Sequence, residues 1–138
     1  METMNSTLMA LAGFAGWTVL LTFGLVNVRL FNAFGGAKIP LNKFSPSGDD
    51  LPGFGQRFTR AHLNCLETLP IFAALVIAAG LSDQLSVMEG TAMYLLFSRI
   101  AQSITHMIST SMLMVLLRAV FLSVQVALML YYSYQLLF

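Results

Sequence analysis

The sequence predicts an all-α integral membrane protein that folds as a single four-helix bundle. Hydrophobic residues make up 57% of the 138 residues and charged residues only 9%, whereas an ordinary soluble domain carries roughly 25% charged residues. Such a chain has too little polar surface for a compact soluble monomer. Its apolar stretches are separated by polar connections, and each approaches the length of about 20 residues that a membrane-spanning helix needs.

The first helix is expected over about residues 7–30, because residues 8–28 carry no charged side chain. A secretory signal peptide is the weaker alternative, since the N-terminal end has Glu2 but no Lys or Arg and the apolar run is too long. The following loop is expected to be irregular, because it is rich in turn formers. These turn formers are Gly35, Gly36, Pro40, Pro46, Gly48 and Pro52.

The remaining helices are expected over about residues 57–81, 89–109 and 112–137. The connections between them are short, and short connections make consecutive helices antiparallel neighbours. The chain is therefore predicted to cross the membrane four times, with both termini on the same side.

The distribution of charge predicts which side that is. Five of the seven Lys and Arg residues lie in or beside the first loop, whereas the connection after the second helix carries Asp83 and Glu89 without a cation. The positive-inside rule then places the first loop in the cytoplasm and both termini outside. The five cations are Arg29, Lys38, Lys43, Arg57 and Arg60.

Polar side chains on three of the predicted helices recur at helical spacing, so that each set forms one stripe. Lipid penalises such stripes, and we expect each of them to face protein or a wet cavity. The second helix carries Arg60, Asn64 and Glu67, the third carries Arg99, Gln102 and His106, and the fourth carries Arg118 and Gln125.

The depth of these residues predicts an ion pair between Glu67 and Arg99. Glu67 lies about 10 Å along the second helix from Arg60, at 1.5 Å per residue. Arg99 precedes His106 by the same seven residues. The pair would hold the second and third helices together, and a purely structural role for it remains open.

The remaining cations predict a site for an anion near the cytoplasmic surface. Arg29, Arg60 and Arg118 should lie near that surface, and the planar fork of arginine suits carboxylates and phosphates. Asn64, Gln102 and His106 are expected nearby as further ligand contacts. Structural roles for Arg60 and His106 remain alternatives.

Other residues predict less about function. Asp49 and Asp50 either contact an amino group of a ligand or lie in a solvated turn. Cys65 is more readily explained as a small packing residue than as a reactive thiol. One cysteine and two separated histidines do not make a usual metal-ligand set. A net charge of +1 without a basic cluster indicates no binding of nucleic acid.

The run RAHLNCLE at residues 60–67, the four-helix layout and the basic first loop resemble the MAPEG family, the membrane-associated proteins in eicosanoid and glutathione metabolism. The resemblance covers nearly the whole chain and is strongest to microsomal glutathione transferases and to a bacterial branch. It implies a homotrimer in the bacterial inner membrane with glutathione, the co-substrate, between neighbouring subunits. It also implies glutathione transferase or peroxidase activity toward lipophilic electrophiles.

The resemblance extends to individual residues. Arg29 matches the family's arginine that reaches glutathione. Arg60, Asn64 and Glu67 match positions that contact the ligand or shape its site. Arg99 matches the third-helix arginine that is usually paired with the glutamate.

The resemblance also implies a catalytic role for Arg118, which matches the arginine thought to stabilise the thiolate of glutathione. A guanidinium near a thiol lowers the pKa of that thiol from about 8.5. The chain departs from the family pattern around this residue. Gln102 and His106 replace a histidine and a tyrosine, Leu122 replaces a tyrosine, and Ala119 replaces a serine of some members. A non-catalytic MAPEG-like module that binds a lipid or a partner protein is therefore the alternative.

Overall fold

The computed structural model describes residues 4–35, 39–51 and 53–138, and within these ranges all regular structure is helical. Lys38, one of the cations assigned to the first loop, lies outside the described residues, as do Gly36 and Pro52. The helices are α1 (Ser6–Phe34), η1 (Leu41–Lys43), α2 (Phe54–Leu81), α3 (Ser86–Glu89), α4 (Ala92–Ile108) and α5 (Met112–Leu137).

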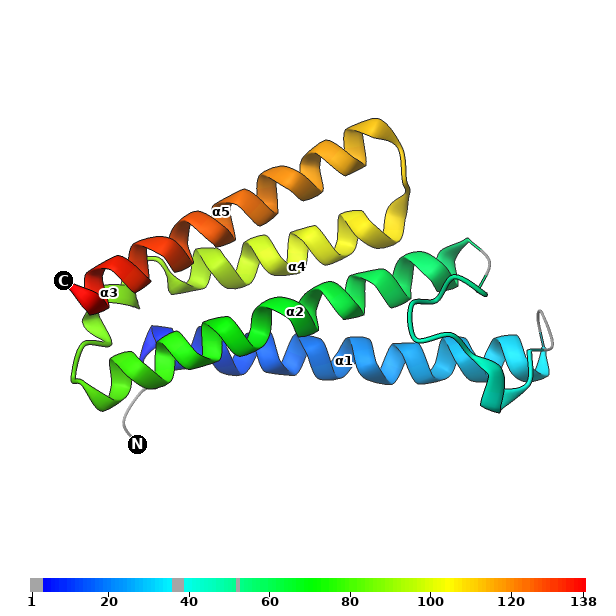
Figure 1. The fold of residues 1–138 in the computed structure, drawn as a ribbon, viewed down its shortest axis with the longest axis horizontal. Coiled ribbons are helices and arrows are strands. Elements are labelled where there is room, and N and C mark those ends of the chain that lie inside the picture. Colours follow the sequence, from blue (N-terminus) through cyan, green and yellow to red (C-terminus); the bar gives the residue numbers. More distant parts are fainter. Residues whose placement is uncertain (1–3, 36–38, 52) are drawn as a thin grey trace.

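The four long helices form an antiparallel bundle (Figure 1). α1 packs along α2, α4 packs against both of them, and α5 packs chiefly against α4. The start of α1, the short α3 and the C-terminus gather at one end of the bundle, whereas the first loop and the α4–α5 connection lie at the other end. We call this second end the loop end. α5 diverges from the other helices as it approaches the loop end.

Among the described residues, three helices are long and apolar enough to cross a membrane, namely α1, α2 and α5. α1 has 29 residues, which at 1.5 Å per residue makes about 43 Å and exceeds the roughly 30 Å of a bilayer core. It continues past the predicted end at residue 30 because Phe31 and Phe34 prolong the apolar run, and Gly35 then ends it. α5 begins at Met112 after the N-cap Ser111, whose hydroxyl accepts a hydrogen bond from the Met114 N–H.

The predicted third helix over residues 89–109 is wrong at its start. The chain forms the single turn α3, breaks at Gly90 and Thr91, and begins the 17-residue α4 at Ala92. Glycine is a poor helix former, and the Thr91 side chain lies 2.7 Å from the Tyr132 hydroxyl of α5. The break leaves α4 shorter than the other three long helices, so the predicted third span is not among the described helices of sufficient length.

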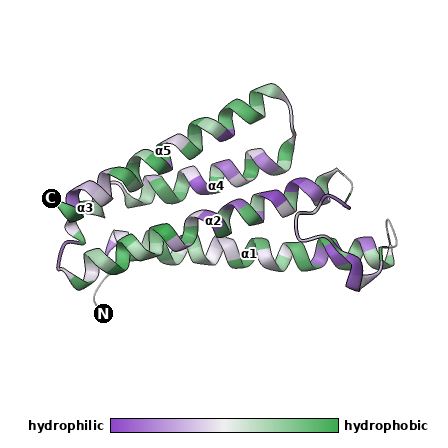
Figure 2. Cartoon of the chain, viewed as in Figure 1, coloured by the Kyte–Doolittle hydropathy of each residue, from purple (hydrophilic) through white to green (hydrophobic). Residues whose placement is uncertain are grey.

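The bundle is apolar on much of its outside and carries polar groups within. Large apolar side chains face outward along the spans, for example Phe23, which is 70% exposed, and Leu130, which is 66% exposed. Buried polar residues include Arg99 and Gln102 of α4. Figure 2 shows hydrophilic residues gathered in the first loop and toward the loop end of α2 and α4. This arrangement suits lipid outside the bundle and a polar site near the loop end.

Candidate functional site

Arg99 is a fully buried cation near the middle of α4. Its Nη1 donates a hydrogen bond to the Asn64 side-chain oxygen of α2, and its guanidinium lies 5.5 Å from the centre of the Phe14 ring. Its Nε and Nη2 are also buried, and neither has a hydrogen-bond partner among the described residues. A buried cation with unsatisfied donors is costly. Arg99 is therefore a strong candidate for contact with an anion.

The predicted direct ion pair between Glu67 and Arg99 is not formed within this chain. Glu67 lies within electrostatic range of Arg99, but the pair of Arg60 and Asp49 is the only cation–carboxylate pair within 4 Å in the part of the chain that the structure describes. The rotation of α2 presents Asn64 to Arg99 and leaves the Glu67 side chain exposed. Helical spacing put both residues on one stripe but could not select between them.

His106 lies within electrostatic range of three guanidinium groups, which we call the arginine cluster: Arg60, Arg99 and Arg118. The charges of all three act on the His106 ring. Arg118 Nη1 is 2.9 Å from His106 Nδ1, and since arginine only donates hydrogen bonds, this ring nitrogen is the acceptor. The structure thus brings two of the three predicted loop-end arginines, Arg60 and Arg118, near the buried Arg99 of α4.

Gln102 makes a contact between helices, where sequence analysis predicted a ligand contact. Its side chain is only 2% exposed, and its oxygen accepts a hydrogen bond of 2.9 Å from the Gln125 side-chain nitrogen of α5. This contact joins α4 to α5. Gln125, the second polar residue of the stripe on the fourth predicted helix, thus bonds through its nitrogen, while its Oε1 is buried without a partner among the described residues.

Arg29 lies apart from the arginine cluster in a single chain. Its guanidinium lies 5.9 Å from the centre of the Phe44 ring, and its charge acts on His62 of α2. The His62 Nε2 in turn is 2.8 Å from the Thr22 hydroxyl of α1. His62 and Arg60 are separated by about 200° around α2, at 100° per residue. The two arginines therefore flank different sides of α2.

The first loop supplies a partner for Arg60 that sequence analysis did not identify. An oxygen of Asp49 lies 3.4 Å from a guanidinium nitrogen of Arg60. The Ser47 hydroxyl, which donates to the other oxygen over 2.8 Å, and the Arg60 guanidinium hold the pKa of Asp49 below its usual range. The two residues are eleven positions apart across a loop, so no helical spacing could indicate the contact.

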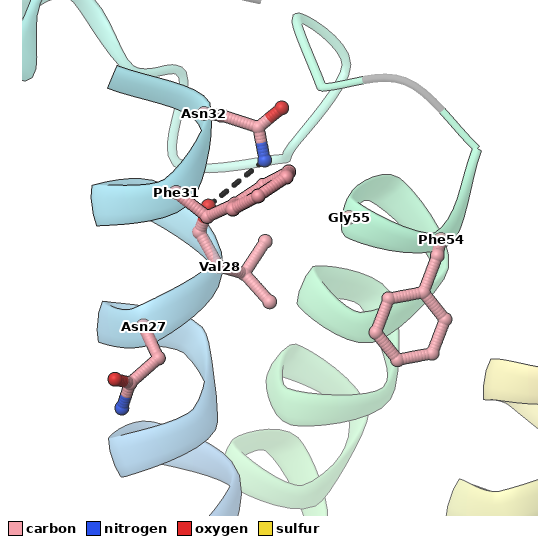
Figure 3. A pocket seen from close by; sticks show the side chains of 6 residues that line it. All are labelled: Asn27, Val28, Phe31, Asn32, Phe54 and Gly55. Carbon is pink, nitrogen blue, oxygen red and sulfur yellow. Dashed lines mark hydrogen bonds between the residues drawn. The ribbon is translucent and has the colours of Figure 1, made fainter. Parts of the chain in front are cut away.

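A pocket of about 420 Å³ lies between α1 and α2 at the loop end (Figure 3). It is lined by Asn27, Val28, Phe31, Asn32, Phe54 and Gly55. The Asn32 amide donates a hydrogen bond of 2.8 Å to the Val28 carbonyl, shown dashed in Figure 3, and so satisfies itself on its own helix. With its largely apolar lining and no charged side chain, the pocket suits an apolar group rather than an anion.

The described ranges, residues 4–35, 39–51 and 53–138, contain no group of three His, Cys, Asp or Glu side chains that could hold a metal ion. Cys65 is buried and lies with its sulfur 3.4 Å from the Ser103 hydroxyl, which donates to the Arg99 carbonyl. It packs within the interface of α2 and α4.

A comparison with known proteins identifies the family of this chain. Neither the curated proteins nor the solved structures gave a match. The model of the MAPEG family matches residues 7–138, which is nearly the whole chain. The match includes every long helix and every residue of the arginine cluster. The chain therefore belongs to the MAPEG family.

Proposed function

We propose that this chain is a membrane-embedded glutathione-binding protein that acts as a glutathione transferase or peroxidase on lipophilic electrophiles. The observation that carries the proposal is the arginine cluster, in which Arg118 contacts His106 and the buried Arg99 has two donors without a partner among the described residues. Within the described residues, neither Arg99 nor Arg118 has a carboxylate within 4 Å. Glutathione carries two carboxylates and an ionisable thiol, and charge-assisted hydrogen bonds from arginine suit all three anionic groups.

Arg118 is the residue proposed to act in catalysis. Only its Nη1 is engaged by His106 among the described residues, and a guanidinium has five N–H donors in all. A donor directed at the thiol sulfur would stabilise the thiolate, which is the nucleophile. The thiolate would then attack an electrophilic carbon of a molecule dissolved in the bilayer and displace its leaving group. With a hydroperoxide it would attack the terminal oxygen and break the O–O bond, so that an alcohol leaves and a second glutathione reduces the resulting sulfenic acid to give the disulfide. Arg60 and Asn64 would hold the charged ends of the peptide.

A homotrimer would complete this site. Arg29 and His62 flank one side of α2, whereas the arginine cluster lies toward α4 and α5. A ligand that contacts both sets needs the Arg29 side of one subunit to meet the cluster of the next. The Glu67 carboxylate is exposed on a membrane-spanning helix, where contact with lipid would be costly. This favours a neighbouring subunit that covers it. Glutathione between neighbouring subunits fits both features.

The proposed orientation has the loop end in the cytoplasm and both termini outside, in the inner membrane of a bacterium. The described cations Arg29, Lys43, Arg57 and Arg60 lie at or near the loop end, which supports this orientation. Cysteine labelling in intact cells tests it, since the only native thiol, Cys65, is buried.

In that test we expect a membrane-impermeant maleimide to label Ser86→Cys in intact cells and to label Asn42→Cys only after the cells are opened. Both positions are exposed, so their reactivity reports the side of the membrane rather than burial. The wild-type chain, which keeps Cys65 alone, measures the background. Labelling of Asn42→Cys before Ser86→Cys would reverse the proposed orientation.

A non-catalytic module that binds a lipid or a partner protein is the second candidate. It is favoured by Leu122, which stands where family members have a tyrosine, and by Gln102, which is already bonded to Gln125. The apolar pocket between α1 and α2 could hold a lipid chain under this alternative. The two candidates differ in whether bound glutathione becomes a thiolate.

Purified protein in detergent separates the candidates. We expect glutathione to bind, the ultraviolet absorbance of a thiolate to appear, and a halogenated nitrobenzene to be conjugated. Replacement of Arg60 with Ala should weaken glutathione binding by about tenfold, because one charge-assisted hydrogen bond is worth roughly 1.5 kcal/mol or more. Binding without thiolate formation would favour the module. No binding at millimolar glutathione would overturn the proposed function.

A further inference from the structure

The first loop is held firmly against the start of α2. Gly48 is buried with φ +77, and a Cβ at this position would lie 2.7 Å from the Thr59 Cβ, so only glycine fits without a shift. Leu51 is 4% exposed and packs near Gly55 of α2. The Asp50 carboxylate accepts a hydrogen bond of 2.9 Å from the Ser45 backbone N–H. Residues 45–51 therefore form an ordered strap over α2.

The strap directs one carboxylate at the arginine cluster. Asp49 accepts hydrogen bonds from the Ser47 hydroxyl, the Gln56 amide and the Arg60 guanidinium. Asp50 is occupied within the loop and makes no such contact. The Asp49 side chain is 64% exposed and that of Arg60 is 53% exposed. Exposed ion pairs are weak, so a ligand can take over either partner.

This geometry favours one class of ligand at Arg60. A simple anion bound there would meet the negative charge of Asp49 and be repelled. A ligand with adjacent carboxylate and ammonium groups can place its carboxylate on Arg60 and its ammonium on Asp49. Arg60 then exchanges the Asp49 carboxylate for that of the ligand, and Asp49 exchanges the Arg60 guanidinium for the ligand's ammonium group. Every charge therefore keeps a partner of opposite sign.

We propose that Asp49 is a specificity residue that selects ligands with an amino-acid headgroup, a carboxylate next to an ammonium, at Arg60. The inference rests on the proposed function in that it names the end of the ligand that this part of the site recognises. The strap is the positioning element, because it fixes the distance between Asp49 and Arg60.

The test compares glutathione with N-acetylglutathione, which has the same carboxylates but no ammonium group. Wild-type protein should bind glutathione more tightly, and Asp49→Asn should reduce this preference by about three- to fivefold, the effect of one exposed ion pair. Gly48→Ala, which displaces the strap but keeps the carboxylate, should reduce it similarly. An unchanged preference in both variants would overturn the inference.

Two control variants separate this effect from a general change of charge. Asp83→Asn removes a carboxylate at the other end of the bundle, at a position with φ 56 that asparagine adopts readily. Asp50→Asn removes the neighbouring negative charge of the strap but keeps a side-chain oxygen that can accept the hydrogen bond from the Ser45 N–H. Both should keep the wild-type preference for glutathione, and a loss of preference in Asp83→Asn equal to that in Asp49→Asn would contradict the assigned role.

A second pair of probes keeps the inference testable if glutathione itself does not bind. Glutamate and glutarate differ only in the ammonium group, and their weak binding can be followed by ligand-observed NMR. A preference for glutamate that Asp49→Asn removes would support the inference even if the proposed function failed. Equal binding of the two, or binding of neither, would overturn the inference.

Discussion

Replacement of Arg118 with Ala is expected to lower the turnover of glutathione with a halogenated nitrobenzene by about 100-fold. The physical reason is the loss of a guanidinium that stabilises a developing sulfur anion, and the loss of one preorganised donor to an anion typically lowers kcat by about 10²–10³. Glutathione binding should fall much less, because Arg60 and Asn64 remain. The amplitude of the thiolate absorbance should fall together with kcat.

Two further variants sharpen this prediction. Arg118→Lys keeps the charge but loses the planar fork, so it should recover part of the thiolate signal. Arg57→Gln is the matched control, because Arg57 donates to the Met107 carbonyl and lies outside the arginine cluster. Its turnover should stay near that of the wild type. A normal thiolate spectrum in Arg118→Ala would contradict the role assigned to this residue.

Replacement of Asn64 with Leu is expected to destabilise the protein by about 2–3 kcal/mol, because it removes the hydrogen bond that a buried charge makes. Replacement of Arg99 with Met should have the opposite effect and stabilise the fold by about 1–3 kcal/mol, because it removes a buried cation whose Nε and Nη2 are unsatisfied. Arg99→Met should nevertheless bind glutathione poorly. Denaturant unfolding in detergent micelles, followed by circular dichroism, measures both stabilities.

The double variant tests whether these two effects share one cause. Once Arg99 is Met, the further change Asn64→Leu should cost far less than it does alone, since no buried charge is left without a partner. Asn27→Leu on an exposed face of α1 is the matched control and should change stability by no more than about 0.5 kcal/mol. If the Arg99→Met variant is less stable to denaturant than the Asn64→Leu variant, Arg99 must make stabilising contacts beyond those seen in one chain.

The helical class and the positions of the spans follow from one-dimensional patterns. Apolar runs long enough for a bilayer placed α1, α2 and α5 within a few residues of their observed bounds. The errors occur where tertiary contacts act on the backbone. Thr91 lies beside Tyr132 at the break between α3 and α4, and hydropathy carries no signal of such a contact.

In the candidate site, too, local sequence patterns predicted some features of the side chains and tertiary contacts decided the others. Spacing along α2 grouped Arg60, Asn64 and Glu67 on one stripe, because side-chain directions on a helix repeat every 3.6 residues. It did not indicate that Asn64 rather than Glu67 would meet Arg99. That choice depends on the rotation of α2 against α4, which many packed side chains set together.

The sequence alone determined that this is an integral membrane protein of the MAPEG family with polar stripes on its helices, because composition, spacing and the run at residues 60–67 are local properties of the chain. Only the tertiary structure decided the partners of those stripes: Asn64 for Arg99, Gln125 for Gln102, and Asp49 for Arg60. Helical periodicity fixes the angle of a side chain about its own axis. The approach of a second helix or a loop to that side chain is set by packing, which no single segment encodes.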